Sequence, residues 1–271
     1  MQNGIHFISG MPRAGSTLLA SVLRQNPRFH ARMTSGVGSL VNASLGQMSA
    51  GSEISVFFDE ARRKAVLEGL FDGYYRGIHE EKLVFDTNRI WCSKMPTIAE
   101  LFPKAKVVAC VRHAPWVIDS LERLVRANKF EPSGIFKFDP VGTVYSRAEA
   151  VQGGLGMVGF AWNALKEAFY GEHSDRLMLL TYETLTANPK KAMAALYDFI
   201  GETAFEHDFD DVASDEEVFD ARLGTPGLHR VGKKIEARER RTILPPDLFR
   251  RYESDSFWRD ATQNPNKVRV V

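Results

Sequence analysis

Cysteine is scarce in this chain. Among 271 residues only Cys92 and Cys110 are cysteines, and strand-like apolar sequence surrounds both. Two thiols are too few for a disulfide framework or a four-thiolate metal site. We therefore expect both cysteines to be reduced and buried, where they pack as small hydrophobic residues.

Long apolar runs are missing as well. No uninterrupted run reaches the roughly 18–20 residues that a membrane span needs. The N-terminal sequence MQNGIHFISG also lacks a basic segment followed by the apolar core of a signal peptide. Together these absences predict a cytoplasmic protein without a membrane span.

Neither sign of charge is in excess. Lys and Arg number 35 against 34 for Asp and Glu, which gives a net charge of +1. This balance gives no reason to expect a nucleic-acid partner, so any anion site must be local. One basic stretch, residues 230–241, is either a solvated surface or part of an anion pocket.

The chain alternates short apolar runs with helical patterns. The runs are residues 5–9, 82–86, 106–111 and 176–181. Continuous apolar strands that alternate with helices are typical of a parallel sheet covered on both faces. We predict one α/β domain over residues 1–271, with a P-loop-like parallel sheet of four to five strands and helices on both faces.

The helical patterns between the runs are readable. The spacing of apolar residues predicts helices over residues 56–79, 116–127 and 189–200. Residues 34–52 are rich in Gly, Ser and Asn and predict a loop, either a mobile one near a site or a plain surface loop. The sequence GLGMVG at 154–159 fits a dinucleotide-binding fingerprint, but no strand precedes it, and we interpret it as part of a closely packed helix.

A glycine-bounded loop follows the first predicted strand. Its sequence, GMPRAGST at 10–17, lies between a strand and a helix, where backbone N–H groups and the helix N-terminus bind an anion. An NTP-binding loop requires a Lys directly before the final hydroxyl residue, but here Ser16 follows Gly15. The cation is instead Arg13, which makes an ordinary ATPase or kinase a minority interpretation.

The sequence PRAGST resembles the 5′-phosphosulfate loop of sulfotransferases, which use 3′-phosphoadenosine 5′-phosphosulfate (PAPS). The resemblance implies that the loop binds the sulfate-bearing phosphate and that its arginine is also catalytic. The residues concerned are Arg13, Ala14, Gly15, Ser16 and Thr17.

Two further segments match the family's nucleotide site. Arg112 ends the strand over 106–111, and Ser120 follows eight residues later, a spacing that resembles the family's 3′-phosphate site. Arg123, one helical turn beyond Ser120, is expected to join them. Tyr182, at the end of the last long apolar run, is similar in position to a tyrosine that faces the nucleotide.

Two more matches are expected to complete the site. The sequence CSKMP at 92–96 precedes a Leu-Phe-Pro turn and is similar to the tyrosylprotein branch of the family, which implies that Lys94 is the catalytic lysine. The sequence TPGLHRVGKK at 225–234 is placed like the family's C-terminal loop over the nucleotide, which implies that His229 and Lys233 bind it.

The general base is the main departure from the family. Cytosolic members carry a His directly after a Lys-Thr pair, but here Met95 follows Lys94. The tyrosylprotein branch carries a Glu after the first helix, where this chain has RMTSG at 32–36. Our candidate is Asp86, at the carboxyl end of its strand; the alternative is a loop cap or a partner for Arg89.

These matches predict sulfuryl transfer from PAPS to an acceptor hydroxyl, with an amine as second choice. The acceptor can be a small molecule, a glycan, a lipid or a peptide, and neither a metal nor a redox cofactor is implied. Two alternatives are kept. One is a P-loop kinase that uses ATP and magnesium, and the other is an inactive nucleotide-binding regulatory protein.

Overall fold

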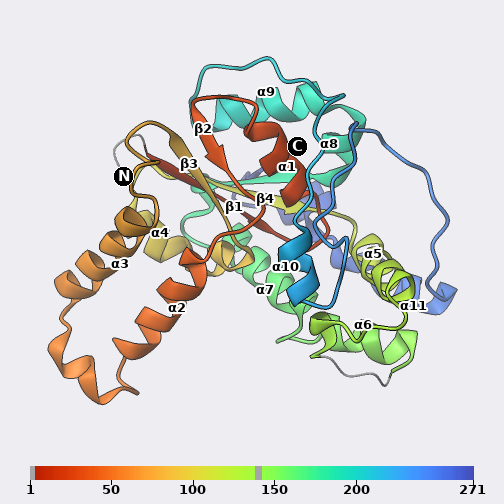
Figure 1. Ribbon diagram of the computed structural model, residues 1–271, viewed down its shortest axis with the longest axis horizontal. Coiled ribbons are helices and arrows are strands. Elements are labelled where there is room, and N and C mark those ends of the chain that lie inside the picture. Colours follow the sequence, from red (N-terminus) through yellow and green to blue (C-terminus); the bar gives the residue numbers. More distant parts are fainter. Residues whose placement is uncertain (1–3, 138–141) are drawn as a thin grey trace.

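The fold is built on a single parallel sheet (Figure 1). The computed structural model describes residues 4–137 and 142–271. Six strands lie in the order β2-β3-β1-β4-β5-β6, and every neighbouring pair is parallel. Their bounds are Ile5–Gly10 (β1), Phe29–Ala31 (β2), Leu83–Thr87 (β3), Val107–Val111 (β4), Leu177–Thr181 (β5) and Arg269–Val270 (β6).

Helices cover both faces of the sheet, as predicted (Figure 1). In the figure α1 and α9 lie on one side and α4 and α7 on the other. The α-helices are α1 (Ser16–Leu23), α2 (Val37–Gln47), α3 (Glu60–Tyr74), α4 (Met95–Leu101), α5 (Ala114–Ala127), α6 (Val144–Gln152), α7 (Met157–Tyr170), α8 (Tyr182–Ala187), α9 (Pro189–Ile200), α10 (Glu217–Arg222) and α11 (Pro246–Arg251). A 3₁₀ helix, η2 (Arg89–Lys94), joins β3 to α4.

Strand β1 lies at the point where the strand order reverses. On one side Ile8 pairs with Thr87 of β3, and on the other Gly10 pairs with Cys110 of β4. The carboxyl ends of these three strands therefore meet at one edge. In open α/β sheets this switch point is where ligands bind.

The predicted sheet is confirmed, but its strand count is six rather than four or five. The two strands that the sequence did not show, β2 and β6, have three and two residues. Runs this short carry no readable periodicity. Both cysteines are free and buried, as expected.

Two predicted segments differ from the structure. Residues 37–47 form the helix α2 inside the stretch that we expected to be a loop. The helix expected over 56–79 is shorter, because the Asp59 side chain accepts a hydrogen bond from the Arg62 amide at 2.7 Å and starts α3 at Glu60. Helix α9 begins and ends as predicted, with Asn188 as its cap and Gly201 in the left-handed conformation.

The glycine-rich sequence at 154–159 begins in the break between two helices and ends in the first turn of the second one, instead of lying within one helix. The chain breaks after α6 and restarts as α7 at Met157. A Cβ on Gly156 would lie 2.3 Å from the Ala150 carbonyl oxygen, and one on Gly159 would lie 2.2 Å from the Gln152 carbonyl oxygen. These glycines thus allow a close approach of backbone.

Candidate functional site

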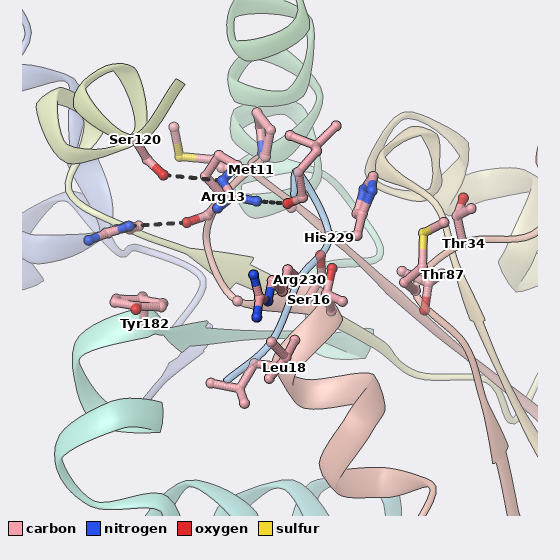
Figure 2. A pocket seen from close by; sticks show the side chains of 18 of the residues that line it. Met11, Arg13, Ser16, Leu18, Thr34, Thr87, Ser120, Tyr182, His229 and Arg230 are labelled. Carbon is pink, nitrogen blue, oxygen red and sulfur yellow. Dashed lines mark hydrogen bonds between the residues drawn. The ribbon is translucent and has the colours of Figure 1, made fainter. Parts of the chain in front are cut away.

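A cavity of about 640 Å³ opens at the switch point (Figure 2). It is lined by the β1–α1 loop, by the ends of β3 and β4, and by the segment from Phe219 to Arg240. Segments far apart in the sequence therefore enclose one space.

The β1–α1 loop has the backbone conformation of an anion cradle. Gly10, Arg13 and Gly15 all have positive φ angles, of 102°, 59° and 98°. Gly10 must be glycine, because a Cβ there would lie 2.1 Å from the Cys110 carbonyl oxygen. Gly15 caps α1 without any side-chain hydrogen bond, so the first amides of α1 remain available to a ligand.

Most of the predicted loop residues reach the cavity. Arg13, Gly15, Ser16 and Thr17 line it. Ala14 is fully buried and does not. Its small side chain instead packs in the core beneath the turn.

Arg13 is held in place on both sides of its guanidinium (Figure 2). Its Nε donates a hydrogen bond to Ser120 Oγ at 3.1 Å, and its Nη1 donates one to the Leu228 carbonyl. Burial and, to a lesser extent, the charge of Arg112 together lower the pKa of Arg13 to about 10. The cation is therefore preorganised but poorly compensated by the protein.

Arg112 lies next to Arg13. Its Nη1 is 3.4 Å from the Arg13 carbonyl oxygen, and its guanidinium lies 4.1 Å from the centre of the Tyr182 ring. Neither arginine forms an ion pair with a carboxylate of the described residues. Two adjacent cations without acids favour an anionic ligand.

Arg123 does not join this group, contrary to the prediction. It is not among the described cavity residues, and its Nε donates to the buried Asp119 carboxylate at 2.8 Å. Arg240 reaches the cavity in its place and pairs with the same carboxylate at 3.1 Å. An acid one turn before Arg123 on α5 explains why the side chain turns away.

The basic C-terminal stretch lines the cavity. Arg230, Lys234, Arg238 and Arg240 all contribute. Lys233, which we expected at the nucleotide, is exposed and outside the cavity lining, and its neighbour Lys234 lines it instead. The sequence offered an anion pocket as one of two interpretations of residues 230–241, but it did not show which of these side chains line the cavity.

His229 and Asp220 form a pair at the cavity wall. The Asp220 carboxylate is fully buried and accepts hydrogen bonds from the His229 backbone N–H at 2.8 Å and from its Nδ1 at 2.6 Å. An ionised carboxylate at Nδ1 selects the tautomer with its proton there, which leaves the Nε2 lone pair free. Burial lowers the pKa of His229 below its usual 6.5, even though Asp220 raises it, so the ring is neutral near pH 7.

Two predicted catalytic residues lie elsewhere. Lys94 ends η2 and is not among the described residues that line the cavity. Asp86 is fully buried and accepts hydrogen bonds from Ser35 Oγ, Tyr75 and Trp91 Nε1. Burial raises the pKa of this carboxyl group and separates it from any substrate in the cavity. The alternative interpretation, a partner for Arg89, does not hold either, because the partners of Asp86 are Ser35, Tyr75 and Trp91.

Sequence reasoning missed several residues of the cavity wall. They include Thr34, Thr87 and Arg89. Thr87 and Arg89 had a readable signal, because they directly follow the apolar run of β3, at the carboxyl edge where parallel strands place their sites.

The described residues were also searched for membrane-spanning helices and for metal-binding groups. No helix among them is long and apolar enough to cross a membrane. Residues 4–137 and 142–271 also contain no group of three or more His, Cys, Asp or Glu side chains placed to hold a metal ion.

Comparison with known structures gives the same fold. The structure of a sulfotransferase from Alicyclobacillus acidocaldarius is similar over 99% of this chain and 96% of its own, with a TM-score of 0.56 and 15% identity. The sulfotransferase domain of the Synechococcus PCC 7002 olefin synthase matches 93% of this chain and 94% of its own, with a TM-score of 0.51 and 20% identity.

Comparison of sequences identifies the family. No curated protein sequence matches the chain significantly. A family model described as the sulfotransferase family matches residues 6–207. This span runs from β1 through α9 and includes the phosphate loop, Arg112 and Tyr182. The resemblance to the tyrosylprotein branch stays a prediction, whereas the chain itself belongs to the sulfotransferase family.

Proposed function

We propose that this protein transfers a sulfuryl group from PAPS to an acceptor hydroxyl, with His229 as the general base. The observation that carries the proposal is the set of residues that line the cavity at the switch point. It holds a phosphate-type loop with two uncompensated arginines and a neutral histidine backed by a buried aspartate.

The nucleotide fits the end of the cavity that holds Arg13, Arg112 and Ser120. The loop amides and the N-terminus of α1 bind the 5′-phosphosulfate, and Arg112 with Ser120 binds the 3′-phosphate. Tyr182, which already stacks on Arg112, lies beside the bound nucleotide. These contacts supply binding energy away from the reacting sulfur.

The transfer step needs a base and a field of positive charge. The acceptor oxygen forms a new bond to sulfur while the bond from sulfur to the bridging phosphate oxygen breaks. The acceptor proton goes to His229 Nε2, and the electron pair leaves on the 5′-phosphate of PAP, the desulfated nucleotide. Arg13 and the loop amides stabilise the charge that develops on the leaving phosphate.

The kinase alternative has less support in the cavity. Magnesium in phosphoryl-transfer sites is held through carboxylates and the substrate phosphates. Among the described residues that line the cavity the one acid is Glu236, whose carboxylate accepts a hydrogen bond from Arg238 Nε at 2.7 Å. The β1–α1 loop also lacks the lysine that an NTP-binding loop carries before its hydroxyl residue, which further disfavours a kinase.

The test is transfer of radiolabelled sulfate from PAPS to a panel of phenols, alcohols, sugars and tyrosine peptides. We expect label in at least one acceptor, and we expect the rate to depend on His229. Phosphoryl transfer from ATP with magnesium, without any sulfuryl transfer, would contradict the proposal. Tight PAP binding without turnover of any acceptor would support the inactive regulatory protein instead.

A further inference from the structure

One hydroxyl group at the cavity has no partner in the protein. Thr87 is the last residue of β3, it is 5% exposed, and its Oγ1 makes no hydrogen bond with the described residues. Buried hydroxyl groups are normally satisfied, so an orphan group calls for an explanation. Because Thr87 lines the cavity, a bound ligand can supply the missing partner.

A free cation follows two residues later. Arg89 also lines the cavity and is exposed to it, and its guanidinium makes no hydrogen bond or ion pair with any described side chain. The other outer arginines are compensated. Arg230, Arg238 and Arg240 pair with Asp215, Glu236 and Asp119.

Arg89 belongs to the side of the cavity that holds the base. The positive charges of Arg13 and Arg89 add to the effect of burial in lowering the pKa of His229. Arg89 therefore lies close enough to the base for its charge to act on it.

Figure 2 shows the same division. Thr87, Thr34 and His229 lie toward one side of the view, and Arg13, Ser120 and Tyr182 lie toward the other. A partly buried hydrogen bond also fixes the side of the cavity that holds Thr34 and Thr87. Asp86 accepts a hydrogen bond from Ser35 Oγ at 2.7 Å, which ties the segment that carries Thr34 to β3.

We propose that the acceptor is a hydroxy acid, whose carboxylate is bound by the Arg89 guanidinium and the Thr87 hydroxyl while its hydroxyl faces His229. This inference rests on the proposed function and names its substrate class. An arginine fork binds a carboxylate through two parallel hydrogen bonds, and a threonine hydroxyl donates a third. A neutral acceptor of the same shape would leave both groups unpaired.

The experiment compares each acid with its methyl ester at saturating PAPS. The probes are 4-hydroxyphenylacetate, 6-hydroxyhexanoate and 12-hydroxydodecanoate, and the proteins are wild type, Arg89→Met, Thr87→Val and the control Arg126→Met. Arg126 lies on α5, outside the described cavity lining, and pairs with Glu122. For wild type we expect kcat/KM for at least one acid to exceed that of its ester by about tenfold or more.

The variants separate the residues involved. We expect Arg89→Met to lower kcat/KM for that acid by roughly 10- to 100-fold and to change the ester little. Thr87→Val should lower the acid's kcat/KM without lowering the melting temperature, because it removes an unsatisfied group. Arg126→Met should keep the preference for the acid.

Three results would overturn the inference. The first is equal or better turnover of every ester. The second is that Arg89→Met loses turnover of both acid and ester and also binds PAPS more weakly while its affinity for PAP is unchanged. That result would place Arg89 at the sulfuryl group, which PAPS carries and PAP lacks. The third is failure of wild type to use any acid while it sulfates neutral alcohols, a result that leaves the proposed function standing. Failure of wild type to bind PAP would instead remove the proposed function itself.

Discussion

At the scale of single residues, the proposed sulfuryl transfer depends on the pairing of His229 with Asp220. A neutral imidazole is useful as a base only if its free nitrogen faces the substrate. The buried carboxylate at Nδ1 fixes that orientation through a 2.6 Å hydrogen bond. Burial keeps the ring neutral by lowering its pKa.

Replacing the histidine should separate chemistry from binding. In His229→Asn the amide nitrogen can still donate to Asp220, but no group can accept the acceptor's proton. We expect turnover to fall by about 10²–10⁴-fold, the usual contribution of a positioned base. PAP affinity, measured by calorimetry, should change by less than about threefold. Near-normal turnover of this variant would assign the base elsewhere.

The pH dependence follows from the same group. The base must be deprotonated, and its folded-state pKa lies below 6.5. We therefore expect kcat/KM to rise with pH below that value and to level off above it. Rates measured from about pH 4.5 to about pH 8.5 test this. A midpoint above 6.5 would contradict the assignment, as would activity that falls over the lower half of the range.

The sequence predicted which residues line the cavity at the β1–α1 loop better than it predicted the proposed base. Arg13, Arg112 and Ser120 lie in or next to elements that are readable from local pattern, and the structure brings them to one cavity. The role of Asp220 depends on a contact with His229 across an irregular segment, which no local period reveals. Asp86 lies near the carboxyl end of its strand, where parallel sheets place their sites. Its carboxylate is nevertheless buried and accepts hydrogen bonds from Ser35, Tyr75 and Trp91.

At the scale of elements, the junction of β3 and η2 places Arg89 at the cavity, whereas Lys94 is not among the described residues that line it. The resemblance implied Lys94, but Lys94 lies at the opposite end of η2 from Arg89, with four residues between them. We expect Arg89→Met to reduce sulfuryl transfer to the preferred acceptor at least tenfold more than Lys94→Met does. Steady-state rates with PAPS for the two variants test this. A larger loss in Lys94→Met would restore the lysine to the site.

The β1–α1 loop makes a prediction about stability. In Gly10→Ala the new Cβ would meet the Cys110 carbonyl oxygen in a backbone of positive φ. We expect a loss of about 3 kcal/mol or more in the free energy of unfolding, from overpacking and left-handed strain together. Denaturant titration measures it.

The control for this variant is Gly46→Ala in α2. A Cβ at Gly46 would have no neighbour within 4 Å, so the change should stabilise the protein by roughly 0.5–1 kcal/mol through helix propensity. Equal effects of the two substitutions would contradict the packing argument.

The elements that the sequence did not predict are those with weak local signals. Strands β2 and β6 are too short for a period, and they form because neighbouring strands offer open edges. Helix α2 is rich in glycine and serine, which have low helix propensity, so its existence depends on tertiary packing of buried residues such as Val37 and Val41.

At the scale of the whole molecule, a nearly neutral chain concentrates positive charge in one cavity. The net charge is +1, yet seven cations line the cavity among its described residues, and one acid does. The cations are Arg13, Arg89, Arg112, Arg230, Lys234, Arg238 and Arg240. A ligand with several negative charges is the natural complement of such a surface.

The proposed nucleotide site is best tested by calorimetry that compares PAP with ATP and magnesium. We predict that PAP binds wild type more tightly than ATP does. We also predict that Arg112→Ala weakens PAP binding by roughly 30-fold or more, because a bidentate arginine–phosphate contact is lost. The control Arg126→Ala, on α5 but outside the described cavity lining, should bind PAP like wild type. Tighter binding of ATP, or normal PAP binding by Arg112→Ala, would contradict the proposed nucleotide site.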